Sequence, residues 1–268
     1  MITTVPNSPE LAHSAPPGAT RDEICALACA EAFRGDGEIL ASPMSTIAAI
    51  GARLAKLTFE PDLVLTDGIA SMIANVTPVG GRSTRGITEG WVPYRTIFDI
   101  VWWGRRHVIM GASQIDRFGN QNISCVGEWQ KPKAQLLGVR GAPGNTINHT
   151  TSYFIPNHSK SVFVERVDMV SGVGYDRAAL LGSRERRFHE IRRVISNLGV
   201  FDFETPDHRM RIRSIHPGVN LDEVVANTGF DLIIPEDVQT TRSPDPEQIR
   251  LMREAIDPDG LGKKELRV

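Results

Sequence analysis

The sequence predicts an α/β fold in which an open, mostly parallel sheet is flanked by helices. Two observations lead to this prediction. Helical and strand patterns alternate from residue 20 to residue 65, which is the rhythm of a parallel sheet covered by helices. In addition, the apolar run at residues 63–65 leads directly into Thr66, Asp67 and Gly68. A buried parallel strand has this pattern where it reaches the carboxyl edge of its sheet.

Helix-capping signals locate the first elements. Thr20 and Glu23 form a capping box at the start of the first helix, and Ser42 and Pro43 suit the N-cap and first position of the second. Residues 74–93 are rich in Gly, Thr and Arg and predict a long loop, which in a compact domain is more often functional than idle. The expected helices cover residues 20–33, 43–57, 94–104, 184–195, 220–227 and 245 onward, and the expected strands cover 38–41, 62–65, 107–110, 147–153, 161–168, 194–200 and 210–215.

The composition excludes several classes of protein. A net charge of -2 and a pI near 6.4 give no reason to expect nucleic-acid binding, and no apolar run approaches the ~18 residues of a membrane span. The three cysteines form no disulfide framework, so a cytoplasmic protein is expected. The seven histidines lack zinc-site spacing, and no metal is expected. The first 19 residues predict a mobile tail, and residues 20–268 predict a single domain.

Several charged or titratable residues can be explained without a functional role. The arginine-rich run at residues 184–193 is interrupted by glutamates and is interpreted as a solvated helix face. His158 and His216 lie in predicted turns and are interpreted as surface residues. His149 and Glu89 are lesser candidates for a site, since a structural histidine and a solvent-exposed carboxylate explain them as well.

Two short stretches carry the candidate site. The first is the turn that contains Thr66 and Asp67 at the end of a predicted strand. The second is the segment 138–145, whose glycines let the backbone approach a ligand closely and direct N–H groups at it. The candidate ligand contacts in this second stretch are Arg140, Gly141, Ala142 and Asn145.

Three uncharged residues between these stretches could also contact a ligand. Gln114, Asn120 and Asn122 offer amide groups suited to a carbonyl or to the amides of a pantetheine chain. The same side chains could equally satisfy the backbone of the turns in which they lie.

An ordered series of runs extends over roughly residues 20–260 and resembles the β subunit of family I coenzyme A transferases of the glutaconate type. The resembling runs cover residues 110–116, 119–122, 138–145, 166–171, 223–231 and 249–258. The resemblance implies an open, mostly parallel α/β sheet of the CoA-transferase family I type. It also implies an α-type partner subunit, in a heterodimer or an α2β2 assembly, with the active site between the two chains. The expected substrate is an acyl-CoA, and no cofactor other than the CoA of that substrate is expected.

Two departures from the transferase pattern bear on the chemistry. Thr66 occupies the place of the glutamate that, in the transferases, attacks the acyl-CoA carbonyl. Asp67 is one residue later, so on an extended strand it points to the opposite face, and a role in capping the turn is the favoured interpretation. In the glycine-rich segment, Gly-Val-Arg-Gly-Ala replaces Gly-Ser-Gly-Gly-Ala and introduces the cation of Arg140.

These departures, together with residues 86–91 and 104–107, are most similar to one branch, the CoA-transferase-like β subunits of actinobacterial steroid and cholesterol catabolism. That resemblance implies a hydrolase in which water attacks a ring ketone of a CoA thioester and the adjacent carbon–carbon bond breaks. Arg140 is the expected catalytic residue, because a fixed guanidinium can stabilise the negative charge of the enolate that departs. The expected general base is a glutamate of the partner subunit.

The sequence leaves three functions open. The first is this ring-opening hydrolase. The second is a true CoA transferase that uses Asp67 or a carboxylate of the partner. The third is a non-catalytic subunit that binds CoA and stabilises the α-type chain.

Overall fold

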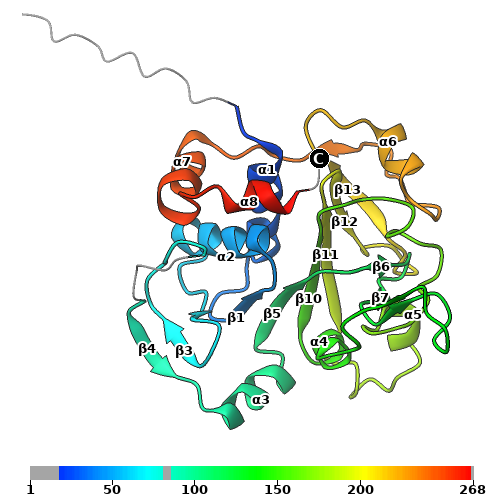
Figure 1. Cartoon of the computed structure of the whole chain (residues 1–268), viewed down its shortest axis with the longest axis horizontal. Coiled ribbons are helices and arrows are strands. Elements are labelled where there is room, and N and C mark those ends of the chain that lie inside the picture. The colour runs from blue at the N-terminus through cyan, green and yellow to red at the C-terminus, as the bar shows by residue number, and fades with distance from the viewer. Residues whose placement is uncertain (1–17, 81–85, 267–268) are drawn as a thin grey trace, which may run out of the picture.

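A seven-stranded sheet forms the centre of the computed structural model, which describes residues 18–80 and 86–266 (Figure 1). The tail predicted for the first 19 residues lies outside the described residues, except for its last two. The strands, in spatial order, are β1 (Leu40–Pro43), β5 (Arg106–Met110), β10 (Thr150–Ile155), β11 (Glu190–Ser196), β12 (Gly199–Asp202), β13 (Arg211–Ile215) and β14 (Gln239–Thr240). The first four strands are parallel, β12 is antiparallel to both neighbours, and β14 is parallel to β13. The predicted open, mostly parallel sheet is therefore confirmed.

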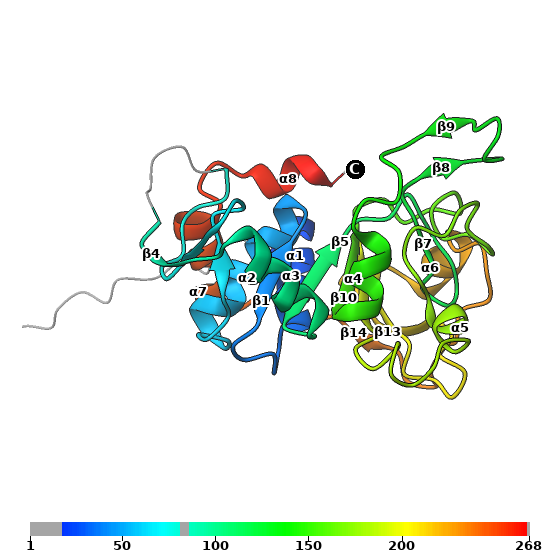
Figure 2. The same cartoon turned by 90° about the horizontal axis from the view of Figure 1, so that it is seen from below.

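Helices cover both faces of this sheet. Helices α1 (Arg21–Ala32) and α2 (Thr46–Thr58) pack on one face, where Ala41, Ile109 and Phe154 contribute to the core. The short helix α4 (Ala142–Asn148) lies on the other face, as Figure 2 shows. The chain ends with α7 (Pro246–Arg250), the π-helical turn η1 (Leu251–Ile256) and α8 (Leu261–Glu265), so the single C-terminal helix predicted from residue 245 is in fact three segments.

Smaller elements extend from the edges of the sheet. Strands β2 (Leu65–Thr66), β3 (Ser71–Ile73) and β4 (Thr88–Trp91) form a separate three-stranded sheet beside β1. The predicted loop at 74–93 therefore contains a strand, and its residues 81–85 lie outside the described part of the chain. The remaining elements are α3 (Tyr94–Trp102), β6 (Gln114–Ile115), β7 (Gln121–Asn122), β8 (Cys125–Val126), β9 (Ala134–Gln135), α5 (Tyr175–Ala178) and α6 (Leu221–Ala226).

The two capping predictions have different outcomes. The backbone N–H of Thr20 donates to Oε2 of Glu23 at 2.8 Å, so the first helix begins where predicted. The second helix begins three residues later than predicted, because the hydroxyl of Ser45 accepts the N–H of Ala48. Ser42 and Pro43 instead end β1, where a proline at the last position of a strand removes no hydrogen bond from the sheet interior.

The predicted helix at residues 184–195 is wrong, because residues 190–196 form the central strand β11. Thr151 pairs with Ile191 whereas Tyr153 pairs with Val194, so β11 has one extra residue at this point. Such a bulge places Ile191 and Val194 on the same face, three positions apart. Apolar residues with that spacing mimic a helical period, which explains the wrong prediction.

Several further predictions need correction, among them the parallel strand expected at residues 62–65, which is β2 at residues 65–66 and pairs antiparallel with β3. Residues 161–168 form no strand but a turn with a single bridge from Phe163 to Ile115, and β10 begins at Thr150 because residue 147 still belongs to α4. His158 and His216 are buried rather than superficial. The ring of His158 stacks on Phe163 at 3.6 Å, and burial lowers the pKa of His158 to about 3.

No helix in the described part of the chain is both long enough and apolar enough to cross a membrane.

The crossing of α1 and α2 depends on Gly51. A Cβ at this position would lie 2.7 Å from the carbonyl oxygen of Ala26 and 2.7 Å from Cβ of Cys29. Gly51→Ala should therefore lower the melting temperature despite its better helix propensity, because overpacking costs about 1–3 kcal/mol and alanine gains only about 1. Gly144→Ala is the matched control: it lies in α4 with its nearest neighbour at 3.8 Å, so its melting temperature should be equal or higher. A Gly51→Ala variant as stable as the parent would contradict this account of the helix crossing.

Candidate active-site half

The first predicted loop follows the end of β2. Leu65 and Thr66 pair with Ile73 and Met72 of β3, so the strand ends at the residue that occupies the transferase glutamate's place. The hydroxyl of Thr66 accepts the backbone N–H of Gly68 at 3.2 Å. Thr66 is half-buried, and its short side chain is directed into its own turn by this bond.

Asp67 caps this turn. Its Oδ1 accepts the N–H groups of Ile69, Ala70 and Ser71 at 2.8, 2.9 and 3.0 Å. These backbone hydrogen bonds, that of Ser71 foremost, hold the pKa of Asp67 below its usual value. A carboxylate whose charge is already satisfied by three donors is a poor nucleophile, so the favoured interpretation as a turn cap agrees with the geometry.

The second predicted loop divides into an exposed turn and a helix. Gly138 has φ = +80° and Arg140 has φ = +51°, so Arg140 adopts a left-handed conformation that a side chain with Cβ seldom takes. Gly141 precedes α4, which begins at Ala142. The side chain of Arg140 is exposed, and no carboxylate in the described ranges 18–80 and 86–266 lies within ion-pair distance of it. The left-handed backbone therefore fixes the position of Arg140 in the turn, and its exposed guanidinium group is available to a ligand.

Asn145 joins α4 to the central sheet. It is buried, its Oδ1 accepts Nη1 of Arg106 at 3.0 Å, and its Nδ2 lies 3.1 Å from the sulfur of Met110. Both partners lie on β5, so Asn145 orients the helix that follows Arg140. Ala142 is also buried, so of the four candidate ligand contacts in this stretch only Arg140 and Gly141 are exposed.

Gln114 and Asn122 are engaged inside the protein. Nδ2 of Asn122 donates to Oε1 of Gln114 at 2.7 Å, and Nε2 of Gln114 donates to Asp168 at 3.0 Å. Oδ1 of Asn122 accepts the N–H of Ser124 at 2.9 Å. Both amides are buried and satisfy the β6–β7 hairpin, which is the structural alternative that the sequence left open.

Asn120 has the same kind of role between two carboxylates. Its Nδ2 donates to both oxygens of Asp116 and, at 2.8 Å, to Oδ1 of Asp176, while its Oδ1 accepts the N–H of Gly174. Burial, with a smaller contribution from the neighbouring Asp176, raises the pKa of Asp116 above its usual value. Asn120 thus keeps two acidic groups together beneath the β6–β7 turn.

The helix predicted at residues 94–104 forms as α3, which lies between the two loops and is exposed, a feature that the sequence did not reveal. All nine residues of α3 are exposed or half-buried, and its aromatic rings follow one another at i, i+4 spacing. Tyr94 contacts Phe98 edge-on at 5.2 Å, and Phe98 contacts Trp102 at 5.6 Å. Tyr94 is 81% exposed and Trp102 is 54% exposed. Their amphipathic spacing was visible in the sequence, but whether another element of the chain covers them was not.

Contacts along the chain connect this helix to both loops. α3 packs against α4, the helix that follows Arg140. On its other side α3 follows β4, which pairs with β3, which in turn pairs with the strand that ends at Thr66. Figure 2 shows α3 between the small sheet and α4. The structure therefore links the two predicted loops through one exposed apolar surface, whereas Gln114, Asn120 and Asn122 belong to the separate β6–β7 hairpin.

The two lesser candidates differ in their positions, since His149 connects two helices and Glu89 is exposed to solvent. His149 is buried at the end of α4, where its Nδ1 lies 3.0 Å from the carbonyl oxygen of Val101 in α3. Burial lowers the pKa of His149 to about 4, so the ring is neutral at pH 7 and connects the two helices. Glu89 is exposed on β4.

The fold and the paired loops define the class of protein. No family model matches the sequence. The structure resembles that of glutaconate coenzyme A-transferase from Acidaminococcus fermentans with a TM-score of 0.75 and 26% sequence identity, over 93% of this chain and 98% of that one. The architecture is therefore that of a CoA-transferase-type subunit.

A higher similarity identifies the family. The chain is 54% identical to the cholesterol ring-cleaving hydrolase IpdB subunit of Rhodococcus jostii, over 93% of this chain and 97% of that one. It also resembles the crystal structure of Rhodococcus jostii RHA1 IpdAB, with a TM-score of 0.87 and 53% identity over 93% of this chain and 99% of that one. The chain belongs to the family of cholesterol ring-cleaving hydrolase IpdB subunits.

Proposed function

We propose that the chain is the β subunit of a hydrolase that opens the last steroid ring of a ketone-containing acyl-CoA in steroid or cholesterol degradation. The observation that carries this proposal is the similarity over nearly the full length to a relative named as a cholesterol ring-cleaving hydrolase subunit. The site residues support the same chemistry, because Thr66 stands where a transferase has its attacking glutamate, and the glycine-rich segment presents the exposed cation of Arg140.

The proposed reaction places a specific demand on this half of the site. Water adds to the ring ketone, the adjacent carbon–carbon bond breaks, and its electron pair moves to the carbon next to the thioester. The products are a carboxylate and a thioester enolate, which takes up a proton. In the proposal Arg140 donates hydrogen bonds to the oxygen on which the enolate charge gathers. A glutamate of the partner subunit removes the proton from water.

A transferase mechanism finds little support in the residues of this chain. Thr66 lacks a carboxylate, and its hydroxyl cannot act as the nucleophile without a base. Asp67 is bound to three backbone N–H groups. Covalent exchange of CoA would therefore need a carboxylate from the partner.

The proposal requires no cofactor beyond the CoA of the substrate. It also places the enzyme in the cytoplasm. The cysteines Cys25, Cys29 and Cys125 are free and buried, which suits a reducing compartment.

The proposal includes an α-type partner that covers α3. A helix with an apolar face and no buried residue is unusual in a folded chain unless a partner covers it. Trp91 and Trp103, at either end of α3, are also exposed and extend the apolar surface. Because this surface lies between the loops of Thr66 and Arg140, a partner docked there would close the active site as it docks.

Tyr94→Glu or Trp102→Glu should weaken the heteromer by at least about tenfold, because losing an aromatic anchor at an interface commonly costs about 2 kcal/mol or more. The measurement is the dissociation constant of the co-purified subunits, determined by light scattering over a dilution series. Thr96→Glu is the matched control, since it adds the same charge on the polar face of the same helix. Equal affinity in all three variants would contradict α3 as the docking surface.

Arg140→Ala should lower kcat for ring opening by about 10²–10³-fold and change KM little, because the contact forms with charge that develops in the transition state. Arg140→Lys should recover only part of the rate, since lysine lacks the planar fork of donors. Steady-state kinetics of the heteromer measure both parameters.

Arg250→Ala is the control for the loss of a surface arginine, because Arg250 lies on α7 and pairs with Glu247 and Glu254. A raised KM with unchanged kcat in Arg140→Ala would show that Arg140 only clamps the substrate. Near-normal values of both parameters would end the catalytic assignment.

A further inference from the structure

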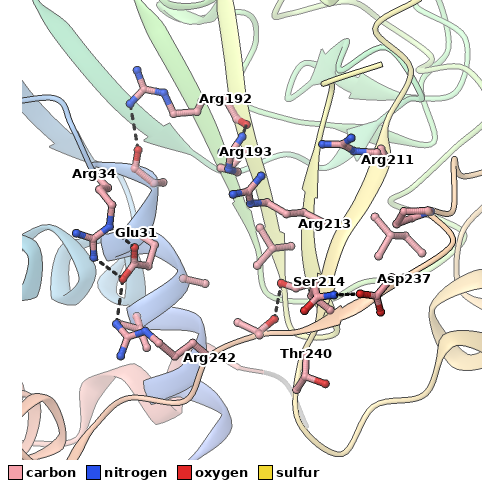
Figure 3. Close-up of a pocket in the computed structure, with 18 residues that line it drawn as sticks. Glu31, Arg34, Arg192, Arg193, Arg211, Arg213, Ser214, Asp237, Thr240 and Arg242 are labelled. Atoms are coloured by element: carbon pink, nitrogen blue, oxygen red, sulfur yellow. Dashed lines mark hydrogen bonds and ion pairs between the residues drawn. The ribbon is translucent and has the colours of Figure 1, made fainter. Parts of the chain in front are cut away.

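A hollow of about 740 Å³ lies on the face of the sheet that α1 covers (Figure 3). One wall contains the second half of α1, a second wall is formed by β11, β12 and β13, and the segment that includes β14 closes the remaining side. α4 packs on the opposite face, and none of the predicted site residues lines the hollow. The volume is within the range of about 300–1,000 Å³ that is typical of sites for small organic ligands.

Arginine dominates the lining. Two carboxylates, Glu31 and Asp237, accompany six arginines. The arginines are Arg34, Arg192, Arg193, Arg211, Arg213 and Arg242. They come from the turn after α1, from β11 and β13, and from the segment after β14, so the cations surround the hollow rather than form a single row.

On the α1 side, one carboxylate serves two arginines. Glu31 accepts Nε of Arg34 at 2.6 Å and Nη2 of Arg242 at 3.0 Å. Two positive charges therefore share one negative charge. Arg242 is half-exposed, and its remaining contact is the neutral side-chain amide of Gln248.

On the strand side, two carboxylates serve three arginines. Arg211 binds Asp202 with two hydrogen bonds of 2.9 and 2.8 Å and leaves little of that carboxylate to its neighbours. Arg213 is held most loosely, with Nη1 at 3.4 Å from Asp202 and 3.7 Å from Glu204. Arg193 contacts the same Glu204 at 3.1 Å. Burial, followed by the positive charge of Arg213, lowers the pKa of Arg193, so the two guanidinium groups repel one another.

The charge of the wider neighbourhood is balanced. Arg192 is neutralised by Asp36 and Glu190, and Asp237 accepts a hydrogen bond from Gln239 on the far side of the hollow. The surplus of positive charge is therefore local. The α1 side has one arginine more than its carboxylate can neutralise, and the strand side has one arginine more than its two carboxylates can neutralise. A ligand with two negative charges could meet both.

The other residues that line the hollow indicate what the uncharged part of such a ligand would be. Leu27, Ala28 and Val200 provide an apolar surface, and Ser214 and Thr240 add hydroxyl groups. An inorganic anion would leave the apolar part uncovered. An organic body of nucleotide size, joined to a diphosphate, would contact the apolar surface and place its charges between the two arginine groups.

We propose that this hollow is a second ligand site, distinct from the acyl-CoA site, which binds a nucleotide-sized organic diphosphate through Arg213 and Arg193 on one wall and Arg242 on the other. The proposal does not depend on the proposed hydrolase activity.

The co-expressed heteromer, already saturated with CoA, is titrated by calorimetry with ADP, inorganic pyrophosphate and citrate. ADP should bind despite the bound CoA, because the two sites lie on opposite faces of the sheet. Pyrophosphate should bind more weakly than ADP, because it lacks an organic body. Citrate that binds as tightly as ADP would overturn the assignment to phosphate.

The double variant Arg193→Gln and Arg213→Gln should lower the affinity for ADP by about tenfold or more, because charge-assisted hydrogen bonds are lost. Arg250→Gln, which removes an exposed and paired arginine elsewhere, should bind ADP normally. If the double variant does not fold, Arg242→Gln tests the opposite wall, where Glu31 retains Arg34 as its partner.

Three results would overturn the proposal: no binding of ADP at millimolar concentration, displacement of ADP by CoA, or the same affinity in the hollow variants as in the parent. An ADP affinity that is high in the isolated chain and lost in the heteromer would show that the partner covers the hollow, which also excludes the site.

Discussion

The centre of the sheet depends on the hydrogen bonds of one buried carboxylate, that of Asp36. Its Oδ2 lies 2.6 Å from Nδ1 of His107 on β5, and its Oδ1 accepts Nη1 of Arg192 on β11 at 2.7 Å. Nε2 of His107 in turn lies 2.9 Å from the hydroxyl of Ser152 on β10. Burial lowers the pKa of His107, opposed by Asp36, and the ring stays satisfied on both sides. One side chain after α1 thereby joins three parallel strands whose polar groups would otherwise be buried without partners.

This arrangement also explains how arginines reach the hollow beside α1. The bulge in β11 places Ile191 and Val194 on the opposite face, so the two residues between them both lie opposite the single residue Ser152. Arg192 binds Asp36, and Arg193 lines the hollow next to Arg213. A local irregularity of the ladder thus supplies both a structural cation and a potential ligand contact.

The sequence predicted the elements whose signals are local. The capping box at Thr20 and the mostly parallel sheet are confirmed. The helices expected at residues 220–227 and from residue 245 also begin there, where Asn220 caps α6 and Asp245 caps α7. The first residues of the strand at 190–196 were assigned to a helix, because a bulge depends on the neighbouring strand and leaves a helix-like spacing in its own sequence.

For the candidate site, the structure connects the two predicted loops through α3, and for Asp67 the favoured role as a turn cap agrees with the geometry. The engagement of Gln114 and Asn122 inside a hairpin could not be decided in advance, because an amide that binds a ligand and one that binds a turn have the same sequence. The exposure of Tyr94 depends on what the rest of the chain fails to cover, which only the tertiary structure reveals.

The proposed chemistry follows from the different roles of Asp67 and Arg140. Structural carboxylates such as Asp67 are satisfied by backbone donors, so this half of the site offers a cation and backbone groups rather than a nucleophile. Arg140 is exposed on a backbone held in a left-handed turn, next to the helix that Asn145 fastens to β5. A base and the closure of the site must then come from a partner, for which α3 offers the apolar surface.

Isotope labelling tests the central claim most directly. The heteromer is incubated with a cyclic ketone-containing acyl-CoA in H₂¹⁸O, and the product is examined by mass spectrometry. Ring opening by water predicts one ¹⁸O atom in a new carboxylate of a product that retains its CoA thioester, with no CoA-bearing protein adduct. Transfer of CoA to an added carboxylic acid, with a covalent glutamyl-CoA on either subunit and no label in the ring-derived carbon chain, would contradict the account.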